Sequence, residues 1–382
     1  MPDRIYLDYA AAVPLLPEVK KIMDEVEEKA WANASSLHQE GREARGVIDD
    51  ARKSIADHVG ADTEEIIFTS GATESNVLAL QGVLEAKRLA GEKPHLVVSK
   101  VEHSSIIEWA RKLEKMGLDI TWLSVDKSGR VDEQELVKSI KENTALVSII
   151  YVNNEVGVVN EIKKLAEVIK SENPNTLFHT DAAQALGWID FNINGLGVDL
   201  LSASSYKLGG PKGVGLLYIK KGIKFNPIFP GTQEWEKRGG TEATSLIAGF
   251  AKAVELSKTW PKEQVSDLGD FLISEITINI PDSVCNTPKE GNINHIAHFS
   301  FSGVESDVLT LALDREGIAV SPGSACSSGA VTVSHVIEAL GIDTQKYPGQ
   351  LRLSLGINTT RQEIETAVKI IEKVVSELRQ KS

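Results

Sequence analysis

Short apolar runs alternate with longer amphipathic segments from about residue 64 onward. Runs that predict strands lie at residues 64–69, 95–100, 145–152, 176–180 and 198–204. Helical patterns lie between them at residues 72–91, 104–117 and 163–173. Apolar, β-branched strands separated by helices of this length are typical of βαβ units. We therefore expect an α/β fold with a largely parallel sheet, and right-handed crossovers that cover both of its faces with helices.

The pattern changes after a helical segment at residues 249–260. Shorter strand patterns follow at residues 295–303, 317–323 and 350–356, and a long amphipathic helix covers residues 361–381. A chain of 382 residues is also longer than one hydrophobic core usually supports. We expect a large domain over residues 21–258 and a smaller α+β domain over residues 259–382. The pattern does not decide where residues 1–20 belong, and we expect them to pack with the smaller domain.

Composition narrows the class of protein. A formal net charge of −13 argues against general nucleic-acid binding and against adhesion to anionic membranes, because both need clustered positive charge. No secretory signal and no apolar run long enough to span a bilayer is visible. The two cysteines, Cys285 and Cys326, form neither a disulfide framework nor a CxxC metal motif. We expect a cytoplasmic protein without a metal site of its own.

Polar residues follow five of the predicted strands. They are Ser70-Gly71-Ala72-Thr73, Glu102-His103-Ser104, Asn153-Asn154-Glu155, Asp181 with Gln184, and Tyr206-Lys207. In open α/β sheets, ligands bind in the crevice beyond the carboxyl ends of the strands. The coincidence of hydroxyls, an imidazole, amides, a carboxylate and an amine at one edge predicts a functional site there.

Each group alone also has an ordinary structural interpretation. The Ser70–Thr73 turn can simply cap a helix, although a helix N-terminus is also a good seat for phosphate. Asp181 can be a helix cap, His103 a structural histidine, and Lys207 or Lys212 a loop lysine. One chemistry uses the whole set, because a pyridoxal phosphate site needs a lysine, an acid against the pyridine nitrogen and phosphate donors. Lys207 directly follows its strand and is the better lysine.

A series of motifs in fixed order indicates a resemblance to a known protein family. They are YLDYAA at residue 6, NASSLH at 33, FTSGATESN at 68, EHSSI at 102, VNNEVGVV at 152, HTDAAQALG at 179, SSYKLGGPKGVG at 204, KRGGTEA at 237, SPGSACSSG at 321 and LRLSLGINTT at 351. Over nearly its whole length the chain resembles the cysteine desulfurases of the class V aminotransferase group. The resemblance implies the fold-type I architecture of pyridoxal phosphate enzymes, with a mainly parallel seven-stranded sheet in the large domain.

The resemblance implies a role for each matched residue toward the cofactor. Lys207 matches the lysine that binds the cofactor aldehyde, and Asp181 matches the acid beside the pyridine nitrogen. Gln184 matches the donor to the ring hydroxyl, and His103 matches the imidazole stacked on the ring. The positions that match phosphate contacts are Gly71, Ala72, Thr73, Ser204, Tyr206 and Thr241. In the family, the residue at the position of Thr241 reaches from the second subunit of a homodimer whose active sites are shared.

The resemblance also implies the substrate and the reaction. Arg352 matches the arginine that binds the substrate carboxylate, with Asn154 and Asn33 beside it. Cys326 matches the nucleophile that takes sulfur from L-cysteine as a persulfide, releases L-alanine, and passes the sulfur to an iron–sulfur scaffold or another acceptor. Contact of Cys326 with an iron–sulfur cluster during transfer is compatible with this role. The small polar residues around Cys326 suit a loop that carries sulfur outward.

Some positions depart from the family pattern and leave alternatives open. Tyr206 stands where the family usually has histidine, so the phosphate site lacks one positive charge. Ala34 replaces a proline, Ala12 and Val13 replace two threonines, and Ile357-Asn358 stand where arginine is frequent. The alternatives are a selenocysteine lyase, another class V lyase or transaminase, or a sulfur-carrier or assembly protein on the same fold without turnover.

Overall fold

A seven-stranded sheet forms the core of the larger part of the molecule. The computed structural model describes residues 4–323 and 333–380. Within them the strand order is β2-β8-β7-β6-β5-β3-β4, and β8 runs in the opposite direction to the other six strands. The strands are β2 (Ile66–Thr69), β3 (His95–Ser99), β4 (Asp119–Leu123), β5 (Thr144–Ser148), β6 (Leu177–Asp181), β7 (Leu200–Ser204) and β8 (Gly215–Ile219). The α/β architecture with a mainly parallel sheet is confirmed.

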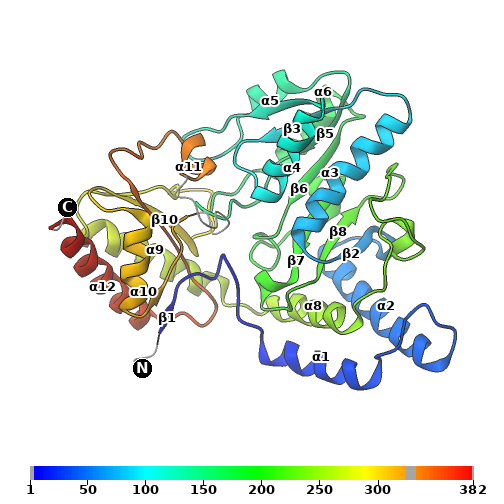
Figure 1. The fold of residues 1–382 in the computed structure, drawn as a ribbon, viewed down its shortest axis with the longest axis horizontal. Coiled ribbons are helices and arrows are strands. Elements are labelled where there is room, and N and C mark those ends of the chain that lie inside the picture. Colours follow the sequence, from blue (N-terminus) through cyan, green and yellow to red (C-terminus); the bar gives the residue numbers. More distant parts are fainter. Residues whose placement is uncertain (1–3, 324–332, 381–382) are drawn as a thin grey trace.

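Helices cover both faces of this sheet (Figure 1). They are α1 (Pro17–Lys29), α2 (Gln39–Val59), α3 (Ala72–Leu89), α4 (Ser104–Lys115), α5 (Glu133–Ser139), α6 (Ile162–Glu172), α7 (Ile193–Leu196) and α8 (Thr244–Ser257). Alternate residues of a strand point to opposite faces. In β3, Leu96 and Val98 pack with α3 and α4, whereas Val97 belongs to the apolar cluster that contains residues of α2, α6 and α8. Burial on both faces explains why these strands read as continuous apolar runs.

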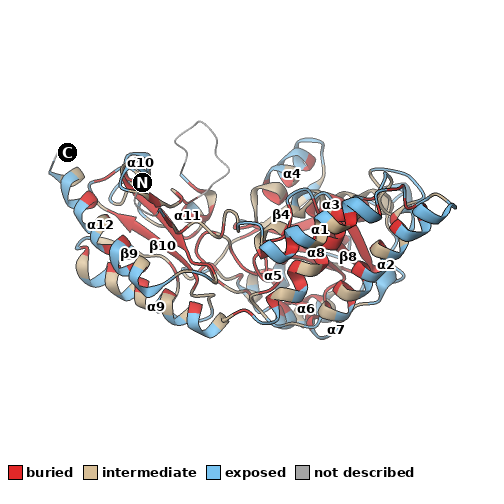
Figure 2. Ribbon diagram, turned by 90° about the horizontal axis from the view of Figure 1, so that it is seen from below, coloured by how far each residue is buried: buried red, intermediate tan, exposed pale blue. Residues whose placement is uncertain are grey.

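The remaining elements form a second lobe (Figure 1). It contains β9 (Ser283–Cys285), β10 (Ile296–Phe301) and β12 (Gly349–Ser354) in an antiparallel sheet of order β12-β10-β9. Its helices are α9 (Lys262–Asn279), α10 (Ser306–Arg315), α11 (His335–Ala339) and α12 (Arg361–Arg379), and β1 (Ile5–Tyr6) pairs with β11 (Ile318–Ala319). Figure 2 shows that buried residues are concentrated in the strands and on the inward-facing sides of the helices.

The N-terminal segment connects the two lobes. Ile5 and Leu7 belong to the apolar core of the second lobe, where β1 pairs with β11. Further along, the N–H of Leu16 donates to the carbonyl of Gly209 in the first lobe. The division of the chain between residues 258 and 259 stays a prediction, and the two apolar cores, which lie mainly on either side of it, favour that division.

Two local differences from the sequence analysis have clear causes. No strand is predicted at β4, whose residues include Asp119 and Thr121 and are mostly part-buried. It lies at the edge of the sheet and pairs with β3 alone, so its sequence lacks the apolar signature of the central strands. The predicted strand at residues 145–152 ends at Ser148 in the structure. The apolar residues after Ser148 are still buried: Ile150 and Val152 line the cavity described below, and Ile149 and Tyr151 belong to the apolar core.

A buried ion pair holds the loop that follows β8. Arg52 donates to both carboxylate oxygens of Glu234 at 2.7 and 2.8 Å, and the N–H of Phe68 donates to the same carboxylate at 2.8 Å. The guanidinium carbon lies 4.6 Å from the ring centre of Phe68 and 4.7 Å from that of Trp235. Three successive non-glycine residues of this loop, from Glu234 onward, have φ of 47°, 53° and 62°. Such strain persists only where the surroundings enforce it.

Removing one partner of this pair is expected to destabilise the protein strongly. Arg52→Met leaves the Glu234 carboxylate buried and unpaired, which costs about 3–5 kcal/mol of the free energy of unfolding. Chemical denaturation measures this change. The matched control is Arg111→Met, which breaks an exposed pair with Glu108 and is expected to cost at most about 1 kcal/mol. Equal effects of the two variants would contradict the role assigned to Arg52.

No helix within residues 4–323 and 333–380 combines the length and the apolar character that crossing a membrane requires.

Candidate active site

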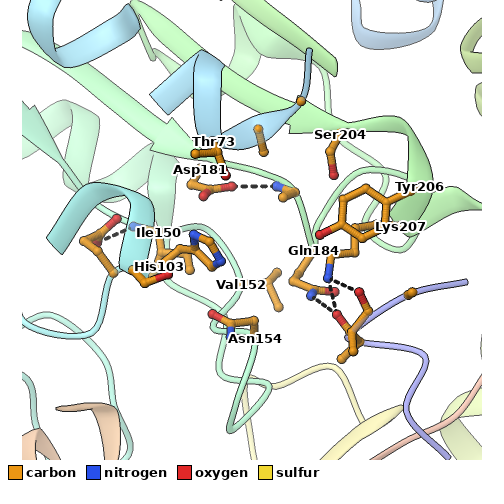
Figure 3. A pocket seen from close by; sticks show the side chains of 18 of the residues that line it. Thr73, His103, Ile150, Val152, Asn154, Asp181, Gln184, Ser204, Tyr206 and Lys207 are labelled. Carbon is orange, nitrogen blue, oxygen red and sulfur yellow. Dashed lines mark hydrogen bonds between the residues drawn. The ribbon is translucent and has the colours of Figure 1, made fainter. Parts of the chain in front are cut away.

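A cavity of about 530 Å³ opens at the edge of the large sheet where its parallel strands end. The loops after β2, β3, β5, β6 and β7 line it, together with residues 10–12 and one residue of β12. Figure 3 shows this cavity from close by. Eleven of the residues singled out from the sequence line it: Gly71, Ala72, Thr73, His103, Asn154, Asp181, Gln184, Ser204, Tyr206, Lys207 and Arg352. The structure therefore brings most of the predicted site together.

The turn before α3 forms one end of the cavity. Gly71 is the N-cap of this helix, and the N–H groups of the first helical turn, which includes Ala72 and Thr73, have no partner inside the helix. The Ser204 hydroxyl is buried at the same cavity and has no hydrogen-bond partner among the described residues. These donors, with the positive end of the helix dipole, suit an anion such as a phosphate group.

The carboxylate of Glu74, in the first turn of the same helix, does not oppose this anion site directly. It accepts bonds from the Arg238 side chain at 2.8 Å and from the Ser70 N–H at 2.7 Å. Burial acts to raise the pKa of Glu74, but the hydrogen bonds from Arg238 and Ser70 outweigh it and lower the pKa. The negative charge is therefore already paired with a guanidinium outside the turn.

Substitution of Gly71 tests the anion site. Its φ of 148° and ψ of 174° lie in a region that essentially only glycine occupies. A Cβ at this position meets no atom within 4 Å, so the expected effect of Gly71→Ala comes from the backbone alone. A strain of about 1–3 kcal/mol is relieved by reshaping the turn, and binding of a phosphate-bearing ligand weakens about ten-fold or more. Equilibrium titration measures this affinity, and unchanged binding would contradict the assignment.

Asp181, at the end of β6, presents a carboxylate to the centre of the cavity. It is 3% exposed, accepts a bond from the Asn76 amide at 2.7 Å and another from the Ala183 N–H at 2.9 Å. A carboxylate has more acceptor sites than these two bonds use. Asp181 can therefore accept one further hydrogen bond from a protonated ring nitrogen in the cavity.

Lys207 follows β7 and lies directly beside the N-terminal segment at one side of the cavity (Figure 3). Its amine donates to the carbonyl of Ala11 at 2.8 Å and also to the carbonyl of Ala10. Gln184 donates to the Ala10 carbonyl at 2.9 Å. The amine also lies 4.7 Å from the ring centre of Tyr206. Lys207 is thus placed at the cavity wall beside an amide donor, where an aldehyde-bearing ligand can be reached.

His103 lines the opposite side of the cavity (Figure 3). It is the N-cap of α4, and its Nδ1 atom lies 2.8 Å from the Ser105 hydroxyl and 3.2 Å from the Ser105 nitrogen. These contacts fix the ring at the start of the helix and leave the other edge of the imidazole for the cavity. The ring is therefore placed to contact a ligand held between it and Lys207.

Arg352 reaches the cavity from β12 in the second lobe. Its guanidinium donates to Asp8 at 2.9 Å and to the carbonyl of Asn154 at 2.8 Å, and it is 1% exposed. Its buried Nε has no acceptor among the described residues. A guanidinium with unused donors at a cavity wall suits a carboxylate ligand.

Two buried acids at this cavity were given no role in the sequence analysis. Burial raises the pKa of Glu102 to about 8, although its carboxyl accepts bonds from Ser99 and from the Ile150 N–H. Burial also raises the pKa of Glu155, which accepts a bond from the Ser334 hydroxyl at 2.6 Å. The sequence points to both of them as polar residues that follow predicted strands, in the motifs at 102 and 152.

Three predicted residues are not in this cavity. Asn33 and Thr241 line a separate cavity of about 510 Å³, together with residues of α1 and α8. Cys326 lies outside the described residues. Two described residues on either side of it are connected to the first cavity: Ser321 pairs with the cavity residue Arg352 through backbone hydrogen bonds of 2.8 and 3.2 Å, and His335 lines the cavity wall.

Comparisons with known proteins identify the family and the fold of this chain. The family model "Aminotransferase class-V" matches residues 5–366. The chain is 42% identical over 383 residues to a protein of Dictyoglomus turgidum named "Cysteine desulfurase IscS", covering 99% of this chain and 96% of that protein. A solved structure named "NIFS-LIKE PROTEIN" is 32% identical with a TM-score of 0.91 and covers 98% of this chain and 100% of its own. A second, "SspA in complex with cysteine", is 34% identical with a TM-score of 0.82, covering 93% and 100%.

Proposed function

We propose a cofactor, a substrate and a sulfur-accepting residue for this chain, which belongs to the class V aminotransferase family and is a cysteine desulfurase. Its cavity binds pyridoxal phosphate and L-cysteine, and the sulfur passes to Cys326. The full-length identity to proteins named cysteine desulfurase supports the activity, and the cysteine complex of a similar structure supports the substrate. The cofactor, the roles of individual residues and the acceptor of the sulfur are the parts that we propose.

The residues of the cavity fit pyridoxal phosphate. The observation that carries this is the placement of an amine, a carboxylate and an anion site around one space: Lys207, Asp181 and the turn at Gly71. Lys207 would hold the aldehyde carbon, and Asp181 would accept the bond of the protonated ring nitrogen. The unpartnered Ser204 hydroxyl, Thr73 and Tyr206 would bind the phosphate. Gln184 would donate to the ring hydroxyl, and His103 would cover one ring face.

The chain's own residues then handle the substrate and its protons. When bound, pyridoxal phosphate supplies an electron sink that makes the α-proton of an amino acid acidic. The Lys207 amine takes the proton from the α-carbon and later returns one. Arg352 binds the substrate carboxylate through two parallel bonds, which a lysine does less well. Asn154, whose carbonyl accepts a bond from Arg352, stands beside this carboxylate site.

Cys326 receives the sulfur. Its thiolate attacks the substrate sulfur, so an S–S bond forms while the bond between that sulfur and the β-carbon breaks. The electron pair of the broken bond ends in a new C–H bond after protonation, which gives alanine. The ends of the chain segment that carries Cys326 support this role, because Ser321 is bonded to Arg352 and Ser334 to Glu155 at the cavity.

A homodimer with shared sites accounts for Asn33 and Thr241. Both lie in the second cavity and not beside Lys207 of the same chain. We propose that Thr241 completes the phosphate site of a second copy. The sulfur acceptor is proposed to be an iron–sulfur scaffold or another thiol-bearing protein, and the cytoplasmic location stays a prediction from the low cysteine content.

Product analysis tests the proposed function. Purified protein supplied with pyridoxal phosphate, L-cysteine and a dithiol is expected to release alanine and sulfide in equal amounts. Activity toward selenocysteine or cysteine sulfinate, without any toward cysteine, would instead identify a different lyase of the same family. A protein that binds no cofactor after pyridoxal phosphate is supplied would point to an assembly protein without turnover.

A further inference from the structure

A line of hydrogen bonds connects Asp181 to His103 beneath the cavity. Asn76, fully buried in α3, donates through Nδ2 to Asp181 Oδ2 at 2.7 Å and to Ser105 Oγ at 2.9 Å. Ser105 in turn lies 2.8 Å from His103 Nδ1 through its hydroxyl. Three elements, β6, α3 and α4, meet in this line, and none of its bonds is needed to close a turn or a sheet.

The direction of every bond in this line is fixed by chemistry. An ionised Asp181 only accepts, so the Asn76 atom that faces it is the NH₂ group and not the carbonyl oxygen. That same NH₂ group donates to Ser105 Oγ, and the serine hydrogen is left for His103 Nδ1. The Ser105 N–H also donates to Nδ1 at 3.2 Å. Nδ1 is therefore an acceptor, and the proton of the neutral ring lies on Nε2.

We propose that Asn76 is a positioning residue that links Asp181 to His103 through Ser105. The charged Asp181 carboxylate orients the Asn76 amide, and the amide orients the Ser105 hydroxyl. The hydroxyl then donates to Nδ1 and so holds His103 as the Nε2–H tautomer. The imidazole then presents a hydrogen-bond donor to the cavity. The acceptor of this bond is an electron-rich atom of the bound amino acid, such as its sulfur, and this part rests on the proposed function. Asn76 touches neither cofactor nor substrate and acts through its neighbours.

The buried state of the Asn76 amide agrees with a dedicated role. Its carbonyl oxygen has no hydrogen-bond partner among the described residues, which costs about 1–3 kcal/mol. A leucine would fill this buried position in α3 without that cost. Asn76 thus retains a destabilising buried amide at a position where its NH₂ group bridges Asp181, at the cavity wall, and Ser105 behind His103.

The tautomer can be observed directly in the holoenzyme. Two-bond proton–nitrogen correlation spectra of protein labelled with nitrogen-15 histidine distinguish Nδ1–H from Nε2–H rings. The variant His103→Gln identifies its signal among the eight histidines. We expect the Nε2–H pattern for His103 in the unmodified protein. In Ser105→Ala the nitrogen-15 chemical shifts of the two ring nitrogens are expected to move toward each other. The longer hydrogen bond from the backbone N–H is then the only one left on Nδ1, and it favours one tautomer less strongly. Ser105→Thr keeps the hydroxyl and is expected to keep the pattern.

Kinetics separate a positioning role from a purely structural one. Ser105→Ala and Asn76→Leu are each expected to lower kcat for cysteine about ten-fold with little change in KM, and the double variant is expected to lose about as much as either single variant. A proton on Nδ1 in the unmodified protein, or an unchanged His103 signal in Ser105→Ala, would overturn the proposal. The spectra require no turnover, so they test the tautomer of His103 even if the protein does not desulfurate cysteine.

Discussion

Replacement of Lys207 by alanine is expected to remove the covalent attachment of the cofactor and to lower kcat for alanine formation by about 10³-fold or more. The reason is that Lys207 has two tasks, holding the aldehyde and moving the α-proton, and the neighbouring groups do not replace either. The Ala10 and Ala11 carbonyls accept bonds, and Gln184 offers only an amide. Absorption spectra before and after gel filtration, together with alanine quantification, measure both effects.

Lys212 provides the control for this variant. It lines the same cavity but stands in the Gly-Pro-Lys-Gly turn, away from the hydroxyls that follow β7. Lys212→Ala is expected to retain the covalent cofactor and measurable turnover. If Lys212→Ala loses the attached cofactor while Lys207→Ala keeps it, the two lysines have been assigned the wrong way round.

The variant Cys326→Ser is expected to stop sulfide release, again by about 10³-fold or more, while the absorption of the bound cofactor is unchanged. Serine keeps the size and polarity of the side chain but does not form an anionic nucleophile near neutral pH. Sulfide detection in the presence of a dithiol measures the loss. Alanine formation is expected to fall in parallel, because the bond to sulfur breaks only when the thiolate takes it.

Cys285 supplies the matched control for that experiment. It lies in β9, where its thiol donates to the Thr287 carbonyl at 3.6 Å, and burial raises its pKa. A thiol held in this way is a poor nucleophile, so Cys285→Ser is expected to leave sulfide release within about two-fold of the original rate. Loss of activity in Cys285→Ser with retention in Cys326→Ser would reverse the assignment.

The central strands and the cavity residues were predictable because both leave local signals. β6 and β7 are short buried strands that begin with apolar residues and end in Asp181 and at the serines before Lys207, and strand ends of a parallel sheet meet at one edge. The edge strand β4 left no such signal, since its residues are partly exposed and polar.

Asn76 and Arg52 show why other contributors were missed. Asn76 lies inside the helical pattern of α3, and its contacts to Asp181 and Ser105 arise only when three elements pack together. In the sequence, Arg52 is one of many charged residues of α2. In the structure it is buried and paired with Glu234, which lies in a loop 182 residues further along the chain. A sequence pattern does not show contacts between residues that are so far apart along the chain.

The central claim is that the cavity holds pyridoxal phosphate on Lys207, and borohydride reduction tests it most directly. The protein is reduced after cofactor loading, digested and mapped by mass spectrometry, with Lys212 as the competing site in the same cavity. Our account predicts that the pyridoxyl mass lies on the peptide with Lys207 and that the visible absorption disappears on reduction. Label on Lys212 alone, or no label on either lysine, would contradict it.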